Sequence, residues 1–266
     1  MLKLISSREH PLFKQLKHLV QANGQYHRGQ AVCIEGVHLA QAWLQTQRLP
    51  DYCITTESAL ADAEIAQIVA ALPKQRCVLL SDTLFRHLSQ LTQGISIFFL
   101  VTPPQLVFPE KLDQDCVILD RIQDPGNVGS ILRSSVAAGI KWVFCLTGTT
   151  AVWSSKALRA GMGAQFQLYI LERVELHTLL PQLAVPMMAT MVNATQNIYQ
   201  TDLTQPLAWA FGNEGSGLTQ ALSDRAQGVA IPQSGEIESL NVAAAAAICL
   251  FERVRQRLYK NSGRGL

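Results

Sequence analysis

At 266 residues the chain is long enough for two ordinary domains, and its 48% of hydrophobic residues can fill a core in each. It has no apolar run of the roughly 18 residues that a membrane span needs, and residues 1–30 lack the apolar centre of a secretion signal, so we expect a cytoplasmic protein without a membrane partner. The net charge is only +2, but residues 1–50 and 251–266 each carry an excess of four positive charges, which suits either contact with nucleic-acid phosphates or a solvated surface.

The first hundred residues are predicted to form a compact α/β domain of ordinary size. The apolar patterns predict strands at 31–35, 52–55, 77–80 and 95–101, and helices at 12–20, 37–47, 59–72 and 83–91. Three prolines, Pro103, Pro104 and Pro109, then interrupt either kind of element. We therefore expect a first domain at 1–101, a linker at 102–114 and a second domain at 115–266.

In the second domain apolar strands and helices alternate. Strands are predicted at 116–120, 142–146, 187–192, 207–211 and 229–232, and helices at 154–162, 176–183 and 218–225, with one helix near Asn127 and a long one at the end. This order predicts a mostly parallel sheet that is covered on both faces.

The first candidate site lies where the strand at 116–120 runs through a turn of glycine and proline into a helix. If Asn127 caps that helix, Arg133 is turned about 100° away from Leu132 of the packed face and can reach a ligand. The packed face then comprises Val128, Leu132, Ser135, Val136 and Gly139. A dinucleotide-binding fold would carry Gly-x-Gly-x-x-Gly at this turn, and that fingerprint is absent, as is a Gly-Lys-Ser/Thr phosphate loop.

Two further polar segments follow later strands. Residues 211–218 gather three glycines around Glu214, and such glycines allow a backbone to approach a ligand closely; a tight turn explains one or two of them but not the acidic residue. Residues 230–242 join a strand end to the last helix. Within them Ser239 fits the N-cap of that helix, and Asn241 is expected in its first turn, so each can both cap and catalyse.

Taken in order, these three segments read Asn-x-Gly-x-x-x-Arg, Gly-Asn-Glu-Gly-x-Gly-Leu and Ile-Pro-x-x-Gly-x-x-x-Ser-Leu-Asn-Val. They resemble the three signatures of the SpoU/TrmH family of RNA ribose methyltransferases, over residues 116 to about 258. Residues 1–101 resemble, more weakly, the ribosomal-protein-like (L30e-like) substrate-binding domain that precedes many of these enzymes, through Phe13-Lys14, Arg28 and Glu35-Gly36. The resemblance implies a trefoil-knotted α/β (SPOUT) methyltransferase domain that binds S-adenosylmethionine in the knot and assembles as a homodimer.

The resemblance also implies roles for particular residues. It assigns Asn127 and Arg133 to the target ribose and its phosphate. The catalytic pocket is completed by Glu214, Ser239 and Asn241, and backbone contacts to the cofactor come from Gly212, Ile231 and Leu240. Arginine is effectively always protonated, so Arg133 suits a phosphate-binding or charge-stabilising role better than that of a base, although the family interpretation sometimes makes it the proton acceptor.

No metal is expected. A sulfonium methyl group is already electrophilic, so its transfer needs an in-line hydroxyl and a route for the proton. The six histidines and six cysteines show no ligand spacing, and the cysteines suit buried, reduced thiols.

The sequence thus predicts an S-adenosylmethionine-dependent enzyme that methylates a ribose 2′-hydroxyl of structured RNA, ribosomal RNA in preference to transfer RNA. A transfer-RNA ribose methyltransferase is the nearest alternative. A nucleotide-binding enzyme that uses residues 212–217 is disfavoured by the missing fingerprint, and a non-catalytic RNA-binding protein is disfavoured by the complete set of site residues.

Overall fold

A computed structural model describes residues 2–21, 29–89, 96–191, 193–235 and 239–261. By its contacts the chain divides into two compact units. Unit 1 comprises Met1–Gln105 and Trp153–Phe166, and unit 2 comprises Leu106–Val152 and Gln167–Leu266. Within the described ranges no helix is long and apolar enough to cross a membrane.

Unit 1 is an α/β unit built on a mixed sheet in the strand order β1-β4-β3-β5-β2. Its elements are β1 (Lys3–Ile5), α1 (Pro11–Gln21), β2 (Val32–Glu35), α2 (Val37–Gln45), β3 (Tyr52–Thr56), α3 (Ala63–Ala70), β4 (Cys77–Leu80), α4 (Asp82–Leu88), β5 (Ile97–Val101) and α6 (Ser155–Gly161). The strands β1, β4 and β3 run parallel, and β5 is antiparallel to both β3 and β2. The strands predicted from the sequence are present, and residue 95 of the last one lies outside the described residues.

Two features of unit 1 differ from the prediction. The three-residue strand β1 was not predicted, because so short a segment shows no alternation. The single helix predicted at 59–72 is a 3-10 turn, Ser58–Ala61, followed by α3. Asp62 separates the two, because its extended backbone and its carboxylate, which accepts from the N–H groups of Glu64 and Ile65, make it the N-cap of α3.

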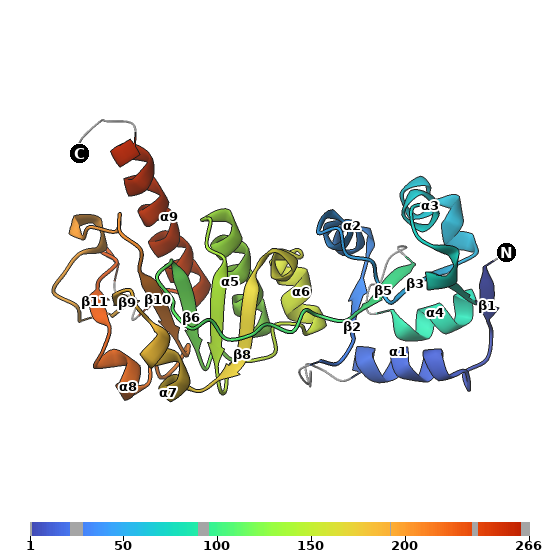
Figure 1. Cartoon of the computed structure of the whole chain (residues 1–266), viewed down its shortest axis with the longest axis horizontal. Coiled ribbons are helices and arrows are strands. Elements are labelled where there is room, and N and C mark those ends of the chain that lie inside the picture. Colours follow the sequence, from blue (N-terminus) through green and yellow to red (C-terminus); the bar gives the residue numbers. More distant parts are fainter. Residues whose placement is uncertain (1, 22–28, 90–95, 192, 236–238, 262–266) are drawn as a thin grey trace. The chain divides into compact units, whose positions relative to one another are not determined.

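Unit 2 contains, among its described residues, six parallel strands in the order β11-β9-β10-β6-β7-β8. The strands are β6 (Cys116–Asp120), β7 (Trp142–Leu146), β8 (Tyr169–Val174), β9 (Met187–Thr190), β10 (Ala208–Gly212) and β11 (Gln227–Val229), and the helices are α5 (Pro125–Ala137), α7 (Leu176–Leu179), α8 (Gln220–Ser223) and α9 (Val242–Asn261). The predicted mostly parallel sheet is confirmed. Helix α9 packs beside α5 and contacts β10 (Figure 1).

The strand β8 was not predicted: between the helices predicted at 154–162 and 176–183 the sequence indicated no strand. It is the edge strand, and Glu172 and Arg173 break its apolar run. Arg173 has a φ of 54°, and the register with β7 shifts between Phe144 and Leu146, so the strand carries neither strict alternation nor a continuous apolar stretch. The strand predicted at 229–232 is β11, which begins two residues earlier.

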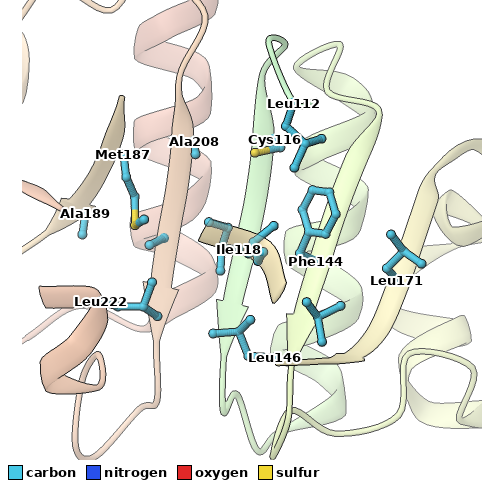
Figure 2. Packing of buried hydrophobic residues seen from close by; sticks show 13 residues of the cluster. Leu112, Cys116, Ile118, Phe144, Leu146, Leu171, Met187, Ala189, Ala208 and Leu222 are labelled. Carbon is cyan, nitrogen blue, oxygen red and sulfur yellow. The ribbon is translucent and has the colours of Figure 1, made fainter. Parts of the chain in front are cut away.

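Alternate residues of the sheet in unit 2 form one hydrophobic cluster. Figure 2 shows Cys116 and Ile118 of β6, Phe144 and Leu146 of β7 and Met187 of β9 on the same side of the sheet. Leu222 of α8 and Leu179 of α7 pack against this face. The intervening residues of each strand therefore point to the opposite face.

Part of the segment predicted to be a linker packs against this core. Leu106 and Phe108 contact the cluster, and Leu112 is buried within it. The backbone of Leu112 donates to the carbonyl of Gln182 at 2.7 Å and accepts from the N–H of Ala184 at 2.8 Å. The chain from Leu106 on therefore contributes to the packing of unit 2.

The basic side chains of α9 are largely engaged inside unit 2. The carboxylate of Asp115 accepts hydrogen bonds from buried Arg253 and, at 2.8 and 3.2 Å, from Arg257. Burial, with the neighbouring charge of Arg257, lowers the pKa of Arg253 to about 10, so it stays protonated at neutral pH. Arg255 pairs with Glu252 through two bonds of 2.8 Å. These three arginines therefore have partners within unit 2 and are not simply solvated, and contact of the basic end with phosphate stays a prediction. Arg264 lies outside the described residues.

We expect Asp115→Asn to destabilise the protein by about 3–5 kcal/mol, because it leaves two partly buried guanidinium groups without their counter-charge. The midpoint of thermal unfolding, followed by circular dichroism, measures this loss. Asp113→Asn is the matched control, because among the described residues Asp113 forms only an exposed ion pair with Lys111 at 3.5 Å. Equal unfolding midpoints for Asp115→Asn and the wild type would contradict a stabilising role for the cluster.

Candidate active site

The three predicted motifs meet at the carboxyl edge of the sheet in unit 2. In the parallel register of β6 and β10, Asp120 lies beside Gly212, so the turns that follow both strands leave the sheet at the same edge. The strand β9 flanks β10 on its other side. Crevices at the carboxyl ends of parallel strands are the usual place for ligands in such sheets.

The glycine-rich segment forms a tight turn after β10. The N–H and carbonyl groups of Asn213 and Gly217 exchange two hydrogen bonds of 3.0 and 2.9 Å, and the Asn213 side chain accepts from the N–H groups of Gly215 and Ser216. A Cβ atom on Gly212 would lie 2.4 Å from backbone atoms of Gly217 and Leu218. Glycine at position 212 is therefore required by the close approach of the turn to the strand end.

Glu214 joins this turn to the start of α5. Its carboxylate accepts from the Nδ2 of Asn127 at 3.0 Å and from the backbone N–H groups of Gln123 and Asp124 at 3.2 and 3.3 Å. Burial raises the pKa of Glu214, but the hydrogen bonds from Asn127, Gln123 and Asp124 outweigh burial and hold that pKa below its usual value. Glu214 is therefore a carboxylate at neutral pH.

The third motif is connected to the first by paired amides. The Nδ2 of Asn241 donates to the Oδ1 of Asn127 at 3.0 Å. The amide of Asn127 is thus engaged at both ends, accepting from Asn241 and donating to Glu214. Residues from all three motifs, far apart in the sequence, form one continuous hydrogen-bonded chain.

Two predicted caps are wrong. Asn127 does not cap α5: the side chain of Asp124 accepts from the N–H of Asn127, and Pro125 occupies the first helical turn, as it commonly does after a cap. Ser239 does not cap α9 either. The Oδ1 of Asn241 accepts from the N–H groups of the second and third residues that follow it, which makes Asn241 the cap of that helix.

These elements enclose a pocket of about 430 Å³, a volume in the range of small-molecule sites. Six of the predicted site residues line it: Gly212, Glu214, Ile231, Ser239, Leu240 and Asn241. Asn127 is tied to the pocket through Glu214 and Asn241. Glu236, Ile237 and Glu238 of the third motif lie outside the described residues.

Part of the lining was not predicted from the sequence. Thr190 and Met191, at the end of β9, and Val242 and Ala245, at the start of α9, also line the pocket. A half-buried strand end of threonine and methionine carries no chemical signature of its own. Only the placement of β9 next to β10 in the sheet, which is a long-range property, identifies the first two.

Arg133 is placed apart from the pocket. It lies on the exposed side of α5, and within the described part of the chain it makes no hydrogen bond or ion pair. Of the predicted packed face, Val128, Leu132 and Ser135 are buried, whereas Val136 is half-buried and Gly139 is exposed. The predicted orientation of Arg133 is confirmed, and its guanidinium is free to bind an external anion.

The described residues bring together no group of three or more His, Cys, Asp or Glu side chains that could hold a metal ion.

Comparison with known proteins identifies the family. The SpoU rRNA Methylase family matches residues 115–251, just over half of the chain. The chain belongs to this family. The predicted SpoU/TrmH membership and SPOUT methyltransferase fold of the second domain are thereby confirmed. The likeness of residues 1–101 to an L30e-like substrate-binding domain stays a prediction.

Similar proteins span nearly the whole chain. An uncharacterized tRNA/rRNA methyltransferase of Synechocystis is 31% identical over 267 residues, which cover 95% of this chain and 94% of the relative. The 23S rRNA (guanosine-2′-O-)-methyltransferase RlmB of Pseudomonas putida is 29% identical over 242 residues, which cover 85% of this chain and 97% of RlmB. The structure of an AdoMet-bound rRNA methyltransferase from Sinorhizobium meliloti superposes with a TM-score of 0.79 at 25% identity, covering 96% of this chain and 98% of that chain.

Proposed function

We propose that this SpoU-family chain transfers the methyl group of S-adenosylmethionine to the 2′-hydroxyl of a ribose in ribosomal RNA. The observation that carries the proposal is that the second and third family motifs line one pocket and that Asn127 of the first motif is hydrogen-bonded to both, with the free Arg133 on the same helix as Asn127. The name of RlmB supports the ribose 2′-hydroxyl and ribosomal RNA as acceptor, and the AdoMet-bound relative supports the cofactor.

The lining of the pocket fits S-adenosylmethionine. Gly212 contributes no side chain to the lining, and Ile231 and Leu240 also line the pocket, where we assign their backbone groups to the cofactor. Met191 and Ala245 add apolar surface, which suits the adenine ring and the methionine chain. When bound, the cofactor supplies a methyl group on a positively charged sulfur, an electrophile that needs no metal.

The chain's own residues then have to position the acceptor hydroxyl and stabilise charge. We assign the phosphate beside the target ribose to Arg133, because a free guanidinium is a planar fork for phosphate oxygens and does not readily give up its proton. The hydrogen bond from the Nδ2 of Asn241 to the Oδ1 of Asn127 fixes the orientation of both side-chain amides beside the pocket. The Ser239 hydroxyl, exposed on the pocket lining, is assigned to the ribose or the cofactor.

Glu214 orients neighbouring residues and does not act as a base. Its lowered pKa makes it a weak proton acceptor, and three N–H donors already occupy its oxygens. Its carboxylate fixes residues 123–127, from which Asn127 projects. We therefore assign Glu214 to shaping the site and not to removing the proton of the hydroxyl.

The choice of RNA and the assembly belong to the same proposal. Lys14 and Lys17 lie on the exposed side of α1 in unit 1, where they suit contact with RNA phosphates, and Arg28 lies outside the described residues. The exposed Phe251 and Leu258 on α9 favour a homodimer. A cytoplasmic location and the preference for ribosomal over transfer RNA are proposed with them.

Calorimetry tests the cofactor assignment. We expect S-adenosylmethionine and S-adenosylhomocysteine to bind in a buffer that contains a metal chelator, and NAD not to bind. Methyl-labelled cofactor should then label ribosomal RNA from cells that lack the gene, and should leave RNA from wild-type cells unlabelled. Preference for NAD would overturn the assignment, and label confined to transfer RNA would replace the proposed target.

A further inference from the structure

A buried carboxylate outside the site described above supports the wall of the pocket from behind. Asp120 is the last residue of β6 and is 1% exposed. Its Oδ2 accepts from the backbone N–H of Thr219 at 2.6 Å, and its Oδ1 accepts from the Nε of Arg121 at 3.2 Å. Thr219 belongs to the segment that follows β10, and Arg121 contacts that segment through the carbonyl of Gly217. Burial of a carboxyl group is costly unless hydrogen bonds compensate for it, and these two bonds do so for Asp120.

Arg121 holds the same segment at two other points. Its carbonyl accepts from the Nδ2 of Asn213 at 2.9 Å, and its Nη2 donates to the carbonyl of Gly217 at 3.2 Å. Its φ is 58°, in the left-handed region, and its N–H donates to the Oγ1 of Thr149. Residues with a bulky side chain rarely adopt this backbone conformation, so the hydrogen bonds of Arg121 to Thr149, Asn213 and Gly217 maintain it.

The segment held in this way is a wall of the pocket. Asn213, Gly217 and Leu218 line the pocket, whereas Asp120 and Arg121 do not. The bonds of Asp120 and Arg121 reach the segment at Asn213, Gly217 and Thr219, which include both ends of the turn. A shift of this turn would change the shape of the space open to the cofactor.

We propose that Asp120 and Arg121 are positioning residues that hold the turn at 213–219 in the conformation that binds S-adenosylmethionine. The inference rests on the proposed function. Neither residue touches the pocket, and saturating cofactor selects the conformation of the turn that binds it. Their loss should therefore weaken cofactor binding and leave the chemical step intact once the cofactor is saturating. A role in overall stability alone would instead lower the unfolding midpoint and leave cofactor affinity unchanged.

The test compares Asp120→Asn, Arg121→Ala and the double variant in the full-length protein. Asparagine can still accept from Thr219 but cannot accept at both oxygens, and alanine at 121 removes the bond to Gly217. Each single variant should raise the dissociation constant for S-adenosylhomocysteine, and the KM for S-adenosylmethionine, by about tenfold or more, with kcat within about threefold of wild type. The double variant should be less than additive, because both residues hold one turn.

Glu175→Gln is the matched control. Glu175 is an exposed acidic residue at the same edge of the sheet, and its side chain accepts from the hydroxyl of Thr147 at 2.6 Å. Within the described part of the chain it makes no hydrogen bond to the turn. Its substitution should leave both constants at wild-type values. If Asp120→Asn loses cooperative unfolding, Arg121→Ala decides the question, because it keeps the carboxylate of Asp120 and its bond from the N–H of Thr219.

Two results overturn the inference. The first is wild-type cofactor affinity in Arg121→Ala or in folded Asp120→Asn. The second is a loss of kcat at saturating cofactor with an unchanged KM. Both are distinct from failure of the proposed function, which would show as the absence of S-adenosylmethionine binding or methyl transfer in the wild-type protein itself.

Discussion

Arg133→Ala is expected to reduce methyl transfer to RNA by about 100-fold or more at saturating cofactor. The side chain is exposed on α5 and free of partners in the described part of the chain, so the substitution removes no internal contact of the fold. The expected loss is that of one donor that stabilises charge in the transition state. Because Arg133 does not line the pocket, the dissociation constant for S-adenosylhomocysteine should stay within about twofold of wild type.

Two further variants define the role of the guanidinium. Arg133→Lys keeps the charge but lacks the planar fork, so it should restore only a small part of the activity. Arg225→Ala is the matched control, because Arg225 is exposed in unit 2 and precedes β11, at the amino edge of the sheet and away from the pocket. Turnover within tenfold of wild type in Arg133→Ala, or a loss of cofactor binding, would contradict the assigned role.

Gly212→Ala is expected to lower the affinity for S-adenosylmethionine by at least about tenfold. The added Cβ would lie 2.4 Å from backbone atoms of Gly217 and Leu218, so the turn that lines the pocket must move. Overpacking of this kind costs about 1–3 kcal/mol, and the thermal unfolding midpoint should fall accordingly. Isothermal calorimetry and thermal unfolding measure the two effects.

Gly215→Ala provides the comparison within the same turn. The nearest atom to a Cβ at Gly215 is the Oδ1 of Asn213, at 3.7 Å, which is an ordinary contact. We expect a much smaller loss of affinity and no loss of stability. Equal effects of the two substitutions would show that the close approach at Gly212 does not determine the shape of the pocket.

The sequence predicted those parts of the fold whose signal is local. The strands β4, β6 and β7 coincide with apolar runs that end in polar turns, and their predicted bounds agree with the structure. The three motifs were placed correctly at strand ends, and parallel strands bring such ends to one edge. Six predicted site residues therefore line one pocket.

Long-range properties were not predicted. The edge strand β8 is interrupted by Glu172 and Arg173, and its pairing with β7 defines it. The choice of caps failed because Asp124 and Asn241 compete with Asn127 and Ser239 for the same role, and the backbone path decides between them. The basic residues of α9 suggested an anion-binding end, whereas Asp115, the partner of Arg253 and Arg257, lies about 140 residues earlier in the chain.

The most direct test of the central claim uses an RNA that differs from the substrate by one atom. Once the labelled nucleotide in ribosomal RNA is mapped, two fragments are prepared, one with a ribose and one with a single 2′-deoxyribose at that position. The proposed function predicts that both fragments bind, that only the ribose fragment accepts labelled methyl, and that nuclease digestion releases the label as a 2′-O-methylated nucleoside. Transfer of methyl to the deoxy fragment, or label on a base, would contradict it.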